Sequence, residues 1–134
     1  MVFGKKENKI EEVTSPEIDS LIGEKLKIIG KVEGEGSIRI DGTIEGDIDY
    51  RGDITISETG IVNGNVNCFN IYIWGKVEGN VKATNKLALY STGKLTGDIE
   101  ISNLIIHDSG FFQGKCTMVN EVEKEKYSEL EVNE

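Results

Sequence analysis

The chain has 134 residues, of which 37% are hydrophobic, with 16 Gly, a single Pro and a formal net charge of −9 at pH 7. This length suits one domain, and the negative charge argues against a nucleic-acid partner, because such a partner requires a basic face. No apolar run is long enough to cross a membrane, and residues 1–20 lack the apolar stretch of a secretory signal.

The chain opens with a short apolar stretch beside two lysines. Met1, Val2 and Phe3 precede Lys5 and Lys6. A Phe side chain can insert at a bilayer interface, and each Lys near anionic lipid contributes about 1 kcal/mol. One such segment binds weakly, but many copies on one assembly would bind together. Residues 1–20 are therefore expected to be a flexible polar tail that either contacts a membrane or remains free.

Between residues 21 and 119 one short pattern, Gly-x-apolar-x-Gly-x-apolar, recurs along the chain. The copies are GKVEGEG from residue 30, GTIEGDI from 42, GIVNGNV from 60, GKVEGNV from 75, GKLTGDI from 93 and the degraded GFFQGKC from 110. Their second glycines fall at 34, 46, 64, 79, 97 and 114, so the steps are 12, 18, 15, 18 and 17 residues. A recurring unit of this size indicates a solenoid.

An apolar-x-apolar element precedes each later copy, as in Ile54-Thr55-Ile56. Such alternation predicts short strands with one apolar face. Asn63-Gly64 alone would suggest an antiparallel hairpin. The other copies have Glu, Thr or Gln before this glycine, and strands this short do not make stable free hairpins. We therefore expect parallel coils, with glycine where the chain turns a corner.

Stacking the coils about 4.8 Å apart turns the apolar positions into columns that share one core. The predicted inward columns are Val32, Ile44, Val62, Val77, Leu95 and Phe112; Ile48, Val66, Val81, Ile99 and Cys116; Ile38, Ile54, Ile71, Leu87 and Leu104; Ile40, Ile56, Ile73, Leu89 and Ile106; and Tyr50, Cys68, Ala83, Ile101 and Met118. The predicted polar columns are Asp47, Asn65, Asn80 and Asp98, and Asp53, Asn70, Asn85 and Asn103. Both cysteines are expected to be reduced core thiols.

One outward column is rich in aromatic side chains. It runs through Asp41, Ser57, Trp74, Tyr90 and His107, with Tyr72 nearby. These rings either stack as an ordinary ladder between coils or form a lateral or partner-binding surface. His107, the only His, has no companions with metal-ligand spacing and is expected to be a structural turn residue.

The ends of the predicted solenoid carry no obvious caps. An open end exposes unpaired backbone groups, which are a template for another chain. Residues 120–134, with two Lys and six Glu, are expected to be an acidic flexible tail or a short helical lid. Coils that match one another would continue from molecule to molecule, and a contact that does not close gives a filament.

In combination, the G-x-[IVL]-x-G-[DN]-[IV] repeats, the apolar-x-apolar partner strands, the polar tails and the opening MVFGKK resemble the bactofilins, which are bacterial cytoskeletal proteins. The resemblance covers about residues 21–119 and the first six residues. It implies an all-β, right-handed parallel β-helix of five to six coils that polymerises end to end without nucleotide and without overall polarity. It also implies a cytoplasmic scaffold at the inner face of the cytoplasmic membrane, acting in cell shape or envelope organisation with cell-wall or envelope proteins as partners.

The contacts between subunits are expected at the two ends of the helix. The family has an apolar residue, often Phe, near the C-terminal end of the helix that matters for polymerisation, and alternation places Phe112 inward and Phe111 outward. Phe112 either only plugs the core or also makes the contact. The candidates are Phe111, Phe112, Cys116 and Met118 at the C-terminal end, and Leu26, Ile28 and Val32 at the N-terminal end. The lateral candidates are Tyr72, Trp74 and Tyr90.

Two other functions compete with a filament-forming scaffold. A monomeric β-solenoid binding module would show a flat face with uniform ladders, whereas the outward columns here are mixed. A left-handed solenoid acyltransferase would show regular six-residue steps and a catalytic His. The segment Gly30–Gly36 lacks the GK[ST] ending of a phosphate loop. No enzymatic activity, nucleotide or cofactor is therefore expected.

Overall fold

The computed structural model describes residues 18–119, which form β-strands and no helix. Short strands alternate with long ones of eight or nine residues through most of the rod. The strands are β1 (Ser20–Ile22), β2 (Lys27–Ile29), β3 (Val32–Ile40), β4 (Thr43–Glu45), β5 (Ile48–Ile56), β6 (Ile61–Asn63), β7 (Val66–Ile73), β8 (Lys76–Glu78), β9 (Val81–Leu89), β10 (Lys94–Thr96), β11 (Ile99–Ile106), β12 (Phe111–Gln113) and β13 (Cys116–Met118).

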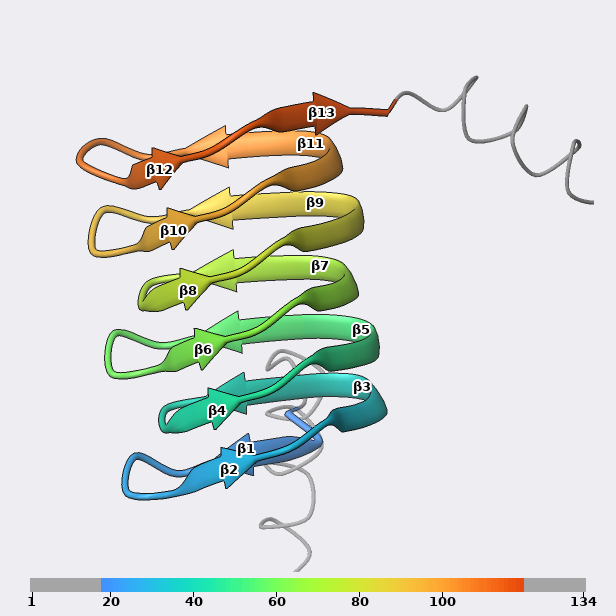
Figure 1. Ribbon diagram of the computed structural model, residues 1–134, viewed down its shortest axis with the longest axis vertical. Helices are drawn as coiled ribbons and strands as arrows, with labels where there is room; N and C mark the ends of the chain where they lie inside the picture. The colour runs from blue at the N-terminus through green and yellow to red at the C-terminus, as the bar shows by residue number, and fades with distance from the viewer. Residues whose placement is uncertain (1–17, 120–134) are drawn as a thin grey trace, which may run out of the picture.

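The strands stack into two parallel sheets that wind around one axis. The seven-stranded sheet has the order β1-β3-β5-β7-β9-β11-β13, and the six-stranded sheet has the order β2-β4-β6-β8-β10-β12. Figure 1 shows the coils stacked along the long axis, with β1 and β2 at one end and β12 and β13 at the other. The fold is a parallel β-solenoid of about six turns, as the spacing predicted. Hairpin pairing is absent from the described residues.

The core is the set of inward columns, and four of the five predicted columns have the predicted members. Ile54, for example, pairs with Ile38 on one side and Ile71 on the other. The side chains of Ile54 and Ile71 are fully buried. Both belong to one core cluster to which the two sheets contribute.

The first column differs from the prediction. Ile28, not Val32, pairs with Ile44, and Val32 pairs with Ile48 at the start of the neighbouring column. The reason is that Gly30, with φ 134°, turns the first corner, and the chain runs straight through Gly34 within β3. The step from the first corner glycine to Gly46 is therefore 16 residues, similar to the later steps.

Corner glycines stack directly on one another along the rod. Gly46, Gly64 and Gly79 all have φ between 144° and 152°, a region that residues with a side chain rarely adopt. A Cβ added at Gly64 would collide with the carbonyl oxygen of Gly46 in the coil below. Glycine is thus required by both the backbone angle and the spacing between coils.

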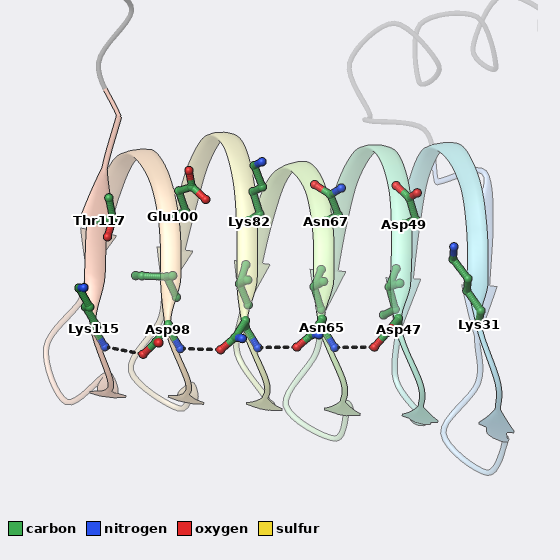
Figure 2. A pocket seen from close by; sticks show the side chains of 15 residues that line it. Lys31, Asp47, Asp49, Asn65, Asn67, Lys82, Asp98, Glu100, Lys115 and Thr117 are labelled. Carbon is green, nitrogen blue, oxygen red and sulfur yellow. Dashed lines mark hydrogen bonds between the residues drawn. The ribbon is translucent and has the colours of Figure 1, made fainter. Parts of the chain in front are cut away.

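A ladder of polar side chains holds neighbouring corners together. The backbone N–H of Asn65 donates to Asp47 Oδ1 at 2.9 Å, and that of Asn80 donates to Asn65 Oδ1 at 3.0 Å. The backbone N–H of Asp98 donates to Asn80 Oδ1 at 3.0 Å, and that of Lys115 donates to Asp98 Oδ1 at 3.1 Å. Figure 2 shows these bonds as a line across successive coils. The predicted polar column therefore supplies one acceptor per coil.

The second polar column forms a similar ladder at the bend of the long strands. Asn70 Nδ2 donates to Asp53 Oδ1 at 2.9 Å, and Asn85 Nδ2 donates to Asn70 Oδ1 at 2.8 Å. Asn103 Nδ2 instead donates to the backbone oxygen of Asn85, at 3.1 Å. These bonds satisfy polar groups that lie beside the core, which lets the strand bend without leaving them unpaired.

The two cysteines have different environments, so one prediction about them is wrong. Cys68 is buried in its column, and burial, followed by the negative charge of Asp53, raises the pKa of its thiol to about 12. Cys116 was expected in the core but is exposed. It pairs with Ile99 as predicted, but β13 is the last strand of residues 18–119, and within this part of the chain no further coil covers it.

Candidate functional site: the two open ends of the solenoid

The N-terminal end of the rod is only half covered. β1 pairs with β3 from Ile38 to Ile40, so among the described residues the first half of β3, Val32–Gly34, has no strand before it. Val32 and Ile28 are only partly buried there. The candidate residues Leu26, Ile28 and Val32 therefore all lie at this end.

One residue before β1 caps the middle of β3. The backbone N–H of Ser37 donates to Asp19 Oδ2 at 2.9 Å, and the backbone N–H of Asp19 donates to the oxygen of Ser37 at 2.9 Å. Asp19 thus satisfies edge groups that would otherwise face solvent. This cap could not be predicted from the sequence, because the polar run before Leu21 has no pattern that distinguishes it from a tail.

The Tyr50 side chain fills the core near the N-terminal end. Its ring lies over Gly34, where an added Cβ would be 2.7 Å from Tyr50 Cε1. Tyr50 is buried, although only one coil separates it from the end. Gly34 therefore makes room for an aromatic ring in the core, whereas the repeat pattern predicted a corner at this residue.

At the C-terminal end, β13 covers only the first half of β11 and leaves the second half of β11 uncovered. β13 pairs with β11 only from Ile99 to Ile101. Within residues 18–119 no strand follows the second half of β11, Asn103–Ile106. Ile106 is 45% exposed, whereas Leu89, which precedes it in the same column, is 0% exposed. The end of the core is thus open to solvent at Ile106, a residue that the predicted interface did not include.

The predicted C-terminal contact residues lie together at this end. Phe112 packs against the core while partly exposed, and Phe111 points outward with Lys94 Nζ 5.3 Å from its ring centroid. Met118 is 55% exposed, and Cys116 lies beside it on β13. Alternation therefore predicted the directions of both Phe side chains correctly.

The outward aromatic column forms a stack on the side of the rod. The ring centroids of Trp74 and Tyr90 are 3.8 Å apart with planes inclined by 3°, and those of Tyr90 and His107 are 4.6 Å apart at 12°. Lys86 Nζ lies 5.2 Å from the ring centroid of Tyr72. The rings thus stack from coil to coil, and His107 occupies the end of the stack.

An open furrow of about 540 Å³ runs along the ladder of Asp47, Asn65, Asn80 and Asp98, with Asp49, Lys82 and Glu100 along its rim (Figure 2). Within residues 18–119 no group of three or more His, Cys, Asp or Glu could hold a metal ion. No helix in the same part is long and apolar enough to span a membrane. The predicted membrane contact, Met1 to Lys6, lies outside the described residues, as does the acidic tail 120–134.

Residues 18–119 thus form a short parallel β-solenoid with one shared core and an uncovered strand edge at each end of the described part. The model of the bactofilin family, described as polymer-forming cytoskeletal proteins, matches residues 20–117. Among curated relatives, bactofilin BacO of Myxococcus xanthus is 27% identical over 100 residues, 75% of this chain and 79% of that protein. Bactofilin BacP of the same organism is 29% identical over 100 residues, which is 42% of its length.

Solved structures give the same result. Bactofilin BacA, determined by solid-state NMR, is 34% identical and matches with a TM-score of 0.68 over 76% of this chain and 98% of that chain. Bactofilin from Thermus thermophilus in double helical filaments, determined by cryo-EM, is 25% identical and matches with a TM-score of 0.68 over 75% of this chain and 99% of that chain. The chain belongs to the bactofilin family of polymer-forming cytoskeletal proteins.

Proposed function

We propose that this chain assembles into filaments by stacking its solenoid end to end, without nucleotide. The observation that carries the proposal is the half-covered coil at each end, where a strand edge and core side chains are exposed together. A second copy would continue the hydrogen-bond ladder along Asn103–Ile106 and cover Ile106. Fully burying one such side chain contributes about 1.5–3 kcal/mol, and several are available at each end.

The C-terminal contact in this proposal consists of Phe112, Ile106 and Met118, with Phe111 and Cys116 beside them. The N-terminal contact consists of Leu26, Ile28 and Val32. Nucleotide independence follows from the source of the energy, since apolar burial and backbone pairing need no bound phosphate. The relative from Thermus thermophilus forms double helical filaments, and we extend this to lateral pairing of filaments of this chain.

We further propose that the filaments lie at the inner face of the cytoplasmic membrane. Met1, Val2 and Phe3 would insert at the interface, while Lys5 and Lys6 would bind anionic lipid. Each filament would present many such segments, so weak contacts would add up to stable binding. The resulting membrane-bound scaffold would organise cell-wall or envelope proteins and so affect cell shape.

The experiment compares two substitutions of exposed apolar residues by arginine. Met118→Arg places a charge at the C-terminal end, and Phe69→Arg places one on the side of the rod, where Phe69 is 49% exposed. Negative-stain electron microscopy and sedimentation of purified protein without nucleotide should show filaments for the wild type and for Phe69→Arg. Met118→Arg should raise the concentration needed for assembly at least tenfold. Equal assembly of the two variants would contradict contact through this end.

A further inference from the structure

A compact apolar surface lies on the outer side of the seven-stranded sheet. Its residues alternate with inward-facing ones along β7, β9 and β11 and continue into the corners that follow. They form two neighbouring columns of three, and we call them the aromatic face. They are Tyr72, Ala88 and Ile105 in one column and Trp74, Tyr90 and His107 in the other.

The pairing of the strands sets this arrangement. Tyr72 pairs with Ala88, and Ala88 pairs with Ile105. Each lies two positions before a member of the ring stack, so both columns point to the same side. Ala88 is nearly fully buried although it points outward, which shows how closely the larger side chains around it pack.

The aromatic face differs from the outward surface of the other sheet. There, the outward column that begins with Lys27 continues through Thr43, Ile61, Lys76 and Lys94, so it carries three lysines along its length. On the aromatic face, the six positions carry no acidic or lysine side chain, and Ile105 is exposed. Tyr72, Trp74 and Tyr90 are partly exposed, and a contiguous exposed group of aromatic and apolar side chains can mark a protein–protein contact.

The stack of rings alone does not account for this composition. Stacking stabilises the column of Trp74, Tyr90 and His107, but it gives no reason for the neighbouring column to be apolar. Ile105 in that column is exposed because it lies on the uncovered second half of β11. Charged neighbours include Lys86, over the Tyr72 ring, and Asp108, which follows His107 in the chain. Arg39, Asp41 and Glu58 line a hollow beside Trp74. The border of the face therefore carries charges of both signs, which suits a partner that also carries both.

We propose that the aromatic face is the contact between two filaments of this chain that lie side by side. The inference rests on the proposed function, because it assumes filaments that pair laterally. A second copy fits for two reasons. The rod from residue 21 to 119 is nearly balanced in charge, with 10 basic and 13 acidic residues, so like charges oppose lateral approach only weakly. Each subunit added to a filament also adds one such face, so pairing strengthens with length.

The test uses two aromatic residues of β7 that differ in position. Tyr72→Glu introduces a charge into the aromatic face in the middle of the rod. Phe69→Glu makes the same kind of change three residues earlier, outside the face. Cryo-EM images of the assembled protein show whether filaments are single or lie in pairs. We expect paired filaments for the wild type and for Phe69→Glu. For Tyr72→Glu we expect single filaments of normal length.

Trp74 provides a second measurement, because it is the only Trp in the chain. Lateral pairing should shift its fluorescence emission to shorter wavelength, while end-to-end assembly of Tyr72→Glu should leave the emission of the unassembled protein unchanged. Paired filaments of Tyr72→Glu, or wild-type filaments that are single, would overturn the lateral contact while leaving end-to-end assembly intact. A wild-type protein that forms no filaments would overturn both proposals.

Discussion

The corner glycines allow a sharp test of the fold, and Gly79 in the middle of the rod is the best position for it. Its φ is 144°, its N–H donates to the oxygen of Thr96 at 2.9 Å, and a Cβ there would collide with the carbonyl oxygen of Gly64. Gly79→Ala therefore has two costs: a backbone conformation that alanine disfavours by about 1–3 kcal/mol, and a displacement of two coils that are hydrogen-bonded to each other.

The expected loss of stability for Gly79→Ala is on the order of 3 kcal/mol or more. For a domain of about 100 residues this lowers the midpoint of thermal unfolding by roughly 12 to 24 °C. The assay is circular dichroism during heating, in a Met118→Arg background so that assembly does not stabilise the folded state by mass action.

Gly23 supplies the matched control. No atom lies within 4 Å of a Cβ added at Gly23, and its φ is not positive. Gly23→Ala should change stability by less than about 1 kcal/mol, because it only restricts the unfolded chain. If both alanine variants melted at the same temperature, the argument that close stacking of corners requires glycine would be refuted.

Three further predictions concern thiol reactivity, pH and membrane binding. The Cys68 thiol is buried, and its burial raises its pKa, so it stays protonated and inaccessible. Iodoacetamide at pH 8 should therefore label only Cys116 in the unassembled protein, and assembly should slow that labelling; prompt labelling of Cys68 would contradict its burial. Burial alone would raise the pKa of Asp41, but hydrogen bonds from Arg39 and then Ser57 hold this pKa below its ordinary value. The ionised Asp41 carboxylate therefore stabilises the fold above its ordinary pKa, and this stabilisation is lost as pH falls through the lowered pKa. The free energy of urea unfolding of Asp41→Asn should thus depend less on pH below about 4 than that of the wild type. An equal dependence on pH in both proteins would count against the hydrogen bond from Arg39 to Asp41. Wild-type filaments should sediment with vesicles that contain anionic lipid and Phe3→Asp filaments should not, whereas equal sedimentation would rule out the proposed membrane segment.

Most of the solenoid could be predicted from the sequence, because its periodic positions repeat the same physical requirement. Ile54, Ile71 and Leu87 occupy the same position in successive coils, and each needs an apolar neighbour in the next coil. The polar ladder could be predicted for the same reason, since Asn65 and Asn80 each occupy the position after a corner glycine.

The first coil could not be aligned correctly from the pattern. Its corner is Gly30, and the position that holds the first glycine in later copies is occupied by Leu26. The more conspicuous glycines nearby are Gly34, which accommodates the Tyr50 ring, and Gly36, which lies against Asp19. A glycine required for packing and a glycine required for a turn are identical in the sequence, and only the contacts distinguish them.

The uncovered halves of β3 and β11 at the two ends could not be predicted from the sequence either. Ile106 matches Leu89 in every respect that the pattern records, and both point into the same column. The difference arises because β13 pairs with β11 for three residues only, so coverage depends on where the pairing stops. No periodic feature of the sequence marks that point.

The comparison of Ile106 with Leu89 also explains why assembly is proposed at the ends. The two side chains have the same chemical character, the same direction and the same kind of neighbour on one side. They differ in what lies on the other side, which for Leu89 is another coil of the same kind. Inside the rod that coil belongs to the same chain; in the proposed filament it would come from another molecule. The interaction that forms the core would then also be the interaction between subunits, with no new type of contact required.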